Sequence, residues 1–167
     1  MVAPPALPEI KRKWYGLALR HLRMASRLYR AGFSDGTVFH TYHAYECTIS
    51  ALIAAKGYQV PPEGKSSITL PSGRSVIGYP SPRGGIREPS SHKARLLFFN
   101  ELADRTRPYY RQHRVLSRFL RINDRMDALY YDATHDRLPH QVYDMLYASQ
   151  VHQDVRQFAE HVWHDIR

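Results

Sequence analysis

No proline interrupts the chain between Pro8 and Pro61, and this interval constrains the fold more than any other feature of the sequence. A proline inside a helix removes a backbone hydrogen bond and costs roughly 3 kcal/mol, so its absence leaves the interval free to form helix. Apolar residues recur at helical spacing in both halves of the interval. We therefore predict one helix over residues 9–31 and a second over residues 34–57.

Stop and start signals support this division. Gly32 and Gly57 stand where the two helical patterns end, and glycine commonly terminates a helix. Ser34 and Asp35 open the second pattern, and both are residue types that cap helix N-termini. We expect the second helix to begin with one of them as its N-cap.

The composition changes over residues 58–90, where six prolines and five glycines fall within 33 residues. Such a density excludes a helix. Two short runs, 67–70 and 74–79, surround the turn residues 71–73 and predict a small β-hairpin. A connection this long inside a compact domain is either functional or mobile.

Three further helices are expected after the insert: one from Ser90 or Ser91 to about 104, one over 108–132 with Pro108 in its first turn, and one from 139 to the end. Together these segments predict an all-α, up-and-down bundle of about five helices, with a long loop and β-hairpin insert between helices two and three. A length of 167 residues suits one domain, over residues 1–167. The helical pattern predicts that Leu17, Val115 and Leu146 face inwards.

The composition excludes several classes of protein. A single cysteine, Cys47, excludes an intramolecular disulfide framework and a zinc site built from several cysteines. No run approaches the ~20 apolar residues of a membrane span, and the first eight residues lack the basic start and apolar run of a secretory signal. We expect a cytoplasmic protein without a membrane association.

The 24 basic residues exceed the 15 acidic ones and give a net charge of +9, which favours phosphate-bearing partners. Most are arginines, and two helical rows hold ten of them. In the predicted fourth helix the spacing of 4, 3, 4, 3 and 4 residues would line one face for about 27 Å, with Arg107, Arg111, Arg114, Arg118, Arg121 and Arg125. The predicted first helix repeats the pattern with Arg20, Arg23, Arg27 and Arg30.

The two rows have two interpretations. The first is a solvated face whose arginine stems cover apolar surface. The second is a surface that follows the phosphates of RNA or DNA, or binds an acidic protein, because guanidinium groups bind phosphate and carboxylate in a forked geometry. Tyr109 and Tyr110 beside the longer row are either base-stacking residues or buried members of the bundle.

Three segments resemble landmarks of the HEPN superfamily, the higher eukaryote and prokaryote nucleotide-binding domains. Residues 39–57 resemble its second helix, in which an alanine and a glutamate two residues later precede a small-residue apolar helix ending in glycine. Residues 91–97 are similar to the opening of its third helix, and residues 125–132 to a variant common among members that are not toxins. The resemblance implies a helical bundle that forms a homodimer and binds RNA or a nucleotide. It also implies a nucleotidyltransferase partner protein in a toxin–antitoxin type system.

The catalytic motif of HEPN ribonucleases is an arginine followed after four to six residues by a histidine. Counting from Arg125 leads to Tyr130, Tyr131 or Asp132 rather than histidine, so the chain resembles members without the motif. The spacing does occur between Arg107 and His113, although it is expected by chance in a chain so rich in arginine. We expect a non-catalytic or weakly catalytic module that binds nucleic acid, a nucleotide or a partner protein. The alternative is a metal-independent RNA endonuclease with a divergent site at a dimer interface, for which Arg125, Tyr130, Arg107 and His113 are weak candidates.

A second polar group lies on the predicted second and third helices. His43 and Glu46 are three residues apart, and His92 opens the third helix. Residues spaced by three drift around a helix rather than share one edge, and no second Glu-x-x-His motif completes a di-metal site. We expect a buried polar contact among His43, Glu46 and His92 that joins the two helices, and no metal or other cofactor.

Overall fold

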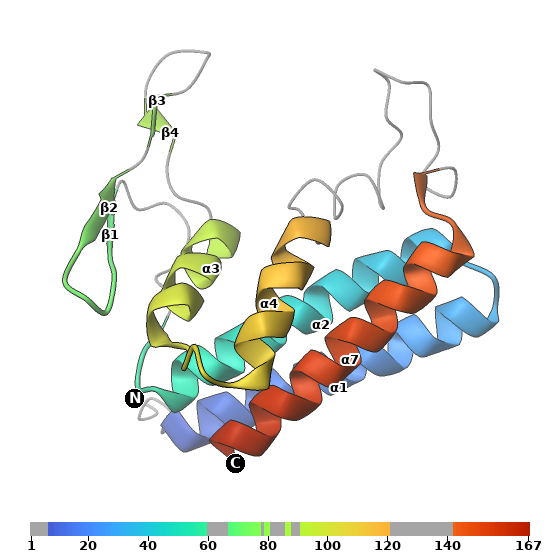
Figure 1. The fold of residues 1–167 in the computed structure, drawn as a ribbon, viewed down its shortest axis with the longest axis horizontal. Coiled ribbons are helices and arrows are strands. Elements are labelled where there is room, and N and C mark those ends of the chain that lie inside the picture. The colour runs from blue at the N-terminus through green and yellow to red at the C-terminus, as the bar shows by residue number, and fades with distance from the viewer. Residues whose placement is uncertain (1–6, 60–66, 78, 81–85, 88–90, 121–141) are drawn as a thin grey trace, which may run out of the picture.

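The computed structural model describes six stretches of the chain, namely residues 7–59, 67–77, 79–80, 86–87, 91–120 and 142–167. Within them the protein forms five α-helices (Figure 1), which are α1 (Leu7–Arg30), α2 (Ser34–Ala55), α3 (Ser91–Leu102), α4 (Pro108–Phe119) and α7 (Met145–Ile166). The prediction of an all-α bundle is confirmed. The three long helices lie side by side along the long axis of the molecule in Figure 1, and α3 and α4 are inclined to them.

The first two helices form a hairpin closed by the short turn at residues 31–33. Gly32 adopts a φ of 82° there, which glycine reaches without the steric cost of a side chain. Gly36 then brings the helices close together, because a Cβ at this position would lie 3.0 Å from Cδ1 of Leu28. The helices consequently pack against each other over their lengths.

The central helix of the bundle is α2, which contacts α1, α3 and α7. Its side chains are buried on almost every side, and the fully buried ones include Tyr45, Ile49 and Leu52. A helix covered all round needs no single apolar stripe. This accounts for the small-residue, mostly apolar sequence of α2.

The C-terminal helix α7 covers α1, α2 and α4. At one end Trp163 stacks on Tyr15 of α1 with 4.2 Å between ring centroids. The ammonium group of Lys11 donates a hydrogen bond to the carbonyl of Ile166. A cation at this helix C-terminus also complements the negative end of the helix dipole.

The insert contains the predicted hairpin, in which β1 (Ser67–Thr69) pairs antiparallel with β2 (Ser75–Ile77). A second ribbon of β3 (Tyr79–Pro80) and β4 (Ile86–Arg87) was not predicted, because two-residue strands carry almost no sequence pattern. The first hairpin is fastened to α3: Glu101 accepts hydrogen bonds of 3.0 Å from the backbone N–H and the hydroxyl of Ser72. Ile68 and Leu70 bury their side chains in the core.

Three predicted helix boundaries are wrong. The fourth helix ends at Phe119 rather than near residue 132, because Leu120 leaves the helical region with φ −84° and ψ 77°. The last helix begins at Met145 rather than 139, since the Asp144 side chain caps it by accepting from the N–H of Tyr147. The N-cap of α2 is Phe33, which makes no side-chain capping bond, rather than Ser34 or Asp35.

Three apolar side chains predicted to face inwards are exposed instead. Leu146 is 80% exposed in the first turn of α7, Val115 is 47% exposed on α4, and Leu17 is 41% exposed on α1. A helical period identifies the apolar side of a helix but not its edges, and exposed apolar residues are common on folded proteins.

Among the described residues, no helix combines the length and the apolar character that a membrane crossing requires.

Candidate nucleic-acid interface

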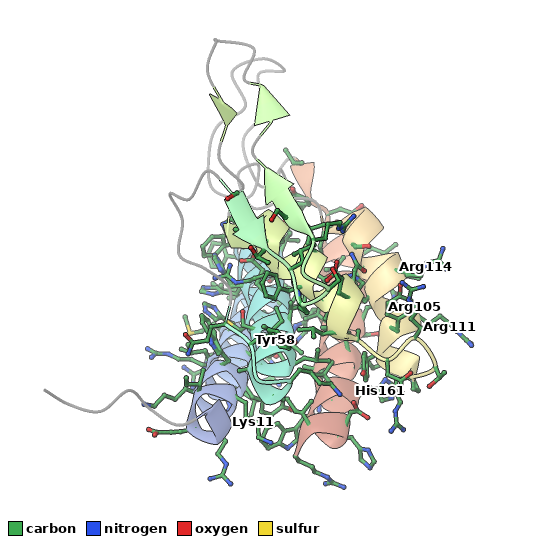
Figure 2. All side chains as sticks on the ribbon, turned by 90° about the vertical axis from the view of Figure 1, so that its left-hand side faces the viewer. Lys11, Tyr58, Arg105, Arg111, Arg114 and His161 are labelled. Atoms are coloured by element: carbon green, nitrogen blue, oxygen red, sulfur yellow. The ribbon has the colours of Figure 1, made fainter. Side chains whose placement is uncertain are left out.

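Four arginines surround the start of α4: Arg105, Arg107, Arg111 and Arg114, all of them exposed. Arg107 is the N-cap residue, with extended backbone at φ −78° and ψ 147°, and Pro108 occupies the first turn. Figure 2 shows the side chains of Arg105, Arg111 and Arg114 projecting from the same side of the molecule. The free N–H groups at the start of a helix add partial positive charge to that side.

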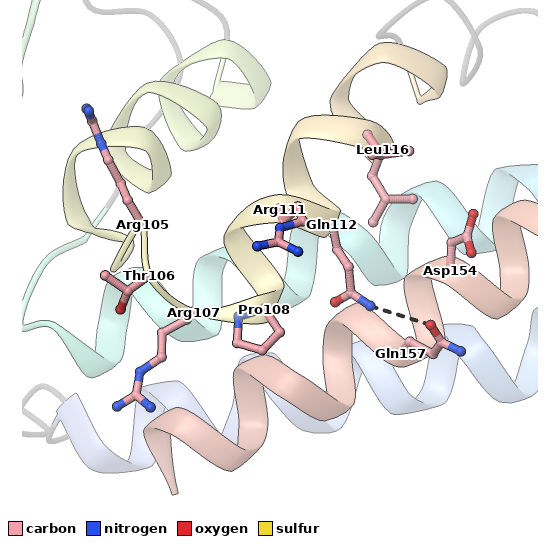
Figure 3. Close-up of a pocket in the computed structure, with 10 residues that line it drawn as sticks. Arg105, Thr106, Arg107, Pro108, Arg111, Gln112, Leu116, Asp154 and Gln157 are labelled. Atoms are coloured by element: carbon pink, nitrogen blue, oxygen red, sulfur yellow. Dashed lines mark hydrogen bonds between the residues drawn. The ribbon is translucent and has the colours of Figure 1, made fainter.

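A pocket of about 440 Å³ opens beside these arginines, between α4 and α7 (Figure 3). Its size is typical of sites that bind small molecules. The lining combines cations, amides, one carboxylate and apolar groups, and consists of Arg105, Thr106, Arg107, Pro108, Arg111, Gln112, Val115, Leu116, Asp154 and Gln157. Such a mixture suits a ligand with one anionic end and one hydrogen-bonding end.

Arg107 is held in place by carboxylates. Its Nε lies 3.0 Å from Oδ1 of Asp165 on α7 and 3.5 Å from Oδ2 of Asp104. The hydroxyl of Tyr109 donates to the other oxygen of Asp165 at 3.2 Å. Burial raises the pKa of Tyr109 to about 12, so its hydroxyl keeps the proton that this bond needs. These contacts fix the N-terminal end of α4 against α7.

Arg111 and Arg114 differ from Arg107 in that no carboxylate of the described residues pairs with them. They lie three residues apart, so they occupy the same side of the helix. An arginine without an internal partner keeps all of its donors available to a bound anion. These two side chains, like Arg105, are therefore available to a bound anion.

A chain of side-chain hydrogen bonds crosses from α7 to α4 near the pocket. Nδ1 of His161 lies 2.9 Å from Oε1 of Gln112, and an amide oxygen only accepts, so this nitrogen is the donor. Nε2 of Gln112 then donates to Oε1 of Gln157 at 3.5 Å (Figure 3). These hydrogen bonds were not predicted from the sequence, because neither glutamine belongs to a motif.

The second arginine row lies on α1, and Arg20, Arg23, Arg27 and Arg30 are all exposed. This row does not join the α4 row: α1 packs against α2 and α7, and α4 packs against α7. Arg23 borders a smaller cavity of about 280 Å³, opposite Arg156 of α7. The Nε of Arg156 is occupied by Glu160 at 3.1 Å.

The far end of the predicted α4 row lies outside the described residues. Arg121, Arg125 and Tyr130 belong to residues 121–141, and α4 ends before them. Arg118 lies within α4. The predicted unbroken row of about 27 Å is therefore wrong for one helix, and its described part is the stretch from Arg107 to Arg118.

His113 occupies the core rather than the surface, and only 2% of it is exposed. Its Nδ1 lies 2.7 Å from the hydroxyl of Tyr45, and its ring lies 4.1 Å from that of Phe99. Burial lowers the pKa of His113 to about 4, so it is neutral near pH 7. Arg107 and His113, two of the weak candidates for a divergent endonuclease site, therefore do not share one surface, because Arg107 is exposed whereas His113 packs into the core.

The structure brings His43, Glu46 and His92 together. Oε1 of Glu46 is hydrogen-bonded to Nδ1 of His92, and its Oε2 lies 3.9 Å from Nδ1 of His43. Tyr42 donates to the same carboxylate at 3.3 Å, and Arg95 of α3 lies 3.7 Å away. The contribution of Arg95, which lies about one helical turn after His92, was not predicted from the sequence.

No group of three or more histidine, cysteine, aspartate or glutamate side chains in the described part of the chain is arranged to hold a metal ion. Glu46 instead uses its oxygens on the hydrogen-bond donors and cations around it. The arrangement stabilises the packing of α2 against α3.

The HEPN domain family model matches residues 12–73, a stretch that contains most of α1, all of α2 and the β1 strand. This match supports membership of the HEPN superfamily over these residues, which make up less than half of the chain. Comparison with curated proteins and with solved structures gives no match. The HEPN match covers the helical hairpin, whereas the arginine-lined pocket lies on α4 and α7, beyond the matched residues. HEPN membership is compatible with a module that binds a nucleotide, RNA or a partner protein.

Proposed function

We propose that this HEPN protein is a binding module for RNA, and that the α4 surface made by Arg105, Arg107, Arg111 and Arg114 contacts the phosphates. The observation that carries the proposal is the pair Arg111 and Arg114, which are exposed and have no carboxylate partner among the described residues. Two unpaired cations on one side of a short helix repel each other by a few tenths of a kcal/mol. A bound phosphate removes that cost.

The pocket supports RNA over an acidic protein. Its apolar groups and amides stand beside the arginines, so a ligand can bind both by charge and by a flat, hydrogen-bonding group. Nucleotides combine these two properties. The acidic side chains of a peptide supply the charge but not the flat, hydrogen-bonding ring.

The test is RNA binding measured by fluorescence anisotropy over a range of salt concentrations. We expect affinity to fall steeply as salt rises, because each phosphate contact releases counterions. The double variant Arg111→Glu/Arg114→Glu should bind much more weakly and with a shallower salt dependence. Binding that ignores salt, or that the double variant retains in full, would contradict the proposal.

The endonuclease alternative predicts a different result when the protein is mixed with labelled RNA. A metal-independent ribonuclease would shorten labelled single-stranded or structured RNA in the presence of EDTA, and Arg125→Ala would abolish cleavage. His113, the one histidine in the described part of α4, is buried and neutral, so it offers no accessible base. We therefore expect the RNA to remain intact.

We further propose that the protein forms a homodimer, since HEPN domains often dimerise. A nucleotidyltransferase partner within a toxin–antitoxin type system remains a proposal that rests on the family resemblance. Mass photometry of the purified protein tests whether it forms a homodimer. Co-purification with a co-expressed nucleotidyltransferase tests the proposed partner.

A further inference from the structure

The pocket between α4 and α7 changes in charge along its length. Arg105, Arg107 and Arg111 occupy the end formed by the start of α4. Asp154 lies at the other end, beside Leu116 (Figure 3). Leu116 is nine residues beyond Arg107, which corresponds to about 13 Å along a helix. A ligand that fills the pocket therefore meets cations at one end and a carboxylate at the other.

The carboxylate of Asp154 is oriented by its own helix. Nε2 of Gln150 donates to its Oδ1 at 3.0 Å. No cation of the described residues pairs with Asp154, so its second oxygen and the remaining lone pairs are available to a ligand. A carboxylate offers only acceptors, so it selects a ligand with hydrogen-bond donors.

The side-chain amide of Gln157, which lines the pocket beside Asp154, is also oriented by hydrogen bonds. Because Nδ1 of His161 donates to Gln112 and Gln112 donates to Oε1 of Gln157, the amide group of Gln157 keeps its N–H donors for the pocket. The pocket thus presents carboxylate acceptors on Asp154 and an amide donor on Gln157. Both residues belong to α7 and lie three positions apart, on the same side of the helix.

Guanine matches this pattern. Its Watson–Crick edge carries two adjacent donors, N1–H and the N2 amino group, next to the acceptor O6. Adenine and cytosine each carry one exocyclic amino donor, and uracil carries one ring N–H, so none of them can give a carboxylate two parallel bonds. The half-exposed Val115 lines the pocket and offers an apolar side chain to the face of a base.

We propose that the pocket binds one unstacked guanine of a single-stranded RNA, with Asp154 accepting from N1–H and the N2 amino group, and Gln157 donating to O6. The adjoining phosphates bind Arg107 and Arg111 at the opposite end. The inference rests on the proposed RNA-binding function and adds base selectivity to it. Asp154 is the residue that determines this selectivity, and the arginines supply affinity for any sequence.

The experiment compares short oligouridines that carry one central guanosine, inosine or adenosine, by fluorescence anisotropy. Inosine keeps O6 and N1–H and lacks only the N2 amino group. We expect the guanosine oligomer to bind the wild-type protein about tenfold more tightly than the other two, as is typical of a base edge read by two parallel hydrogen bonds. In Asp154→Asn the three oligomers should bind alike, because an amide offers one acceptor instead of two.

The matched control is Glu160→Gln, which removes a carboxylate from the same helix at an exposed position outside the pocket and should keep the tenfold preference. Circular dichroism checks that both variants remain folded. Equal binding of guanosine and inosine oligomers by the wild-type protein overturns base selectivity while leaving the RNA-binding function intact, provided that Arg111→Glu/Arg114→Glu still weakens binding. A preference that Asp154→Asn retains also overturns the inference. Absence of binding to every oligomer overturns both proposals.

Discussion

The two arginine rows, on α1 and on α4, look equivalent in the sequence and differ in what surrounds them. Both are exposed. On α4 the row borders a pocket of about 440 Å³ in which a carboxylate and an amide remain available. On α1 the adjoining cavity is about 280 Å³, and two pairs of its polar side chains bond to each other, Ser26 with His152 and Arg156 with Glu160.

The α1 cavity illustrates how such bonds remove binding capacity. The hydroxyl of Ser26 donates to the carbonyl of Leu22 at 2.9 Å, and it lies 2.9 Å from Nε2 of His152. Because the hydroxyl proton is used, Nε2 of His152 is the donor in the second bond. Burial, followed by the charge of Arg156, lowers the pKa of His152, so this cavity has a neutral histidine rather than a further cation. Periodic arginines thus indicate a charged surface, and the neighbouring groups decide whether it can bind a ligand.

The largest effect is expected from reversing the charge of one row at a time. Arg111→Glu/Arg114→Glu should weaken RNA binding on the order of a hundredfold near physiological salt, at about tenfold per lost phosphate contact. The matched variant on α1, Arg23→Glu/Arg27→Glu, should change the affinity by no more than about twofold. Anisotropy titrations at matched ionic strength measure both. Equal losses would mean that the two rows form one continuous binding surface, and that the distinction between them is wrong.

Acidification tests how buried histidines on the same two helices, α4 and α1, contribute to stability. The pKa of His113 on α4 is lowered to about 4 by burial, from the usual 6.5, so the unfolded chain binds a proton more readily than the folded one. The contribution of neutral His113 to the free energy of unfolding is complete above about pH 6.5 and is lost progressively down to about pH 4. We expect a loss of about 2 kcal/mol between pH 7 and pH 5 from this residue.

Urea unfolding at the two pH values measures that loss, and His113→Gln should remove most of it while lowering stability at pH 7. His21 on α1, whose Nδ1 lies 3.0 Å from Nδ1 of His40, serves as the comparison. Burial is the main cause that lowers the pKa of His21 and His40, and both are only half-buried. His21→Gln should therefore leave most of the pH dependence in place. A pH dependence that survives in His113→Gln would contradict the assignment to His113.

The smallest effect concerns the carboxylates that hold arginines beside the two cavities. Asp165→Asn should free the guanidinium of Arg107 and raise RNA affinity about twofold to threefold, because it removes one negative charge beside the α4 surface. Glu160→Gln removes the partner of Arg156 at the α1 cavity and should leave the affinity unchanged. Weaker binding by Asp165→Asn would indicate that Arg107 contributes only when Asp165 positions it.

The sequence predicted the helical hairpin well, since prolines and glycines mark its limits and local rules govern where helices start and stop. It failed where boundaries depend on single backbone turns. The turn at Leu120 that ends α4 has no breaker residue, and the capping bond of Asp144 is one of several that the sequence allows. The predicted contact between Glu46 and His92 is confirmed, and it could be predicted because polar groups on an otherwise apolar helix need partners.

Only part of the candidate site could be predicted from the sequence. Helical spacing identified Arg107, Arg111 and Arg114 as neighbours on one surface, because side-chain direction along a helix follows from its period. Asp154 and Gln157 carry no such signal, and they meet α4 only because α7 packs beside it. His113 shares a helix with the arginines and yet belongs to the core, which its position opposite Tyr45 and Phe99 decides.

The amino-acid sequence by itself determined the all-α architecture, the two basic rows and the excess of positive charge, because these follow from local propensity, period and composition. The tertiary structure alone decided what kind of cavity each row borders, which histidine is buried, and which carboxylate remains available to a ligand. Those properties depend on contacts between residues far apart in the chain, and such contacts arise only when α4 and α7 come together.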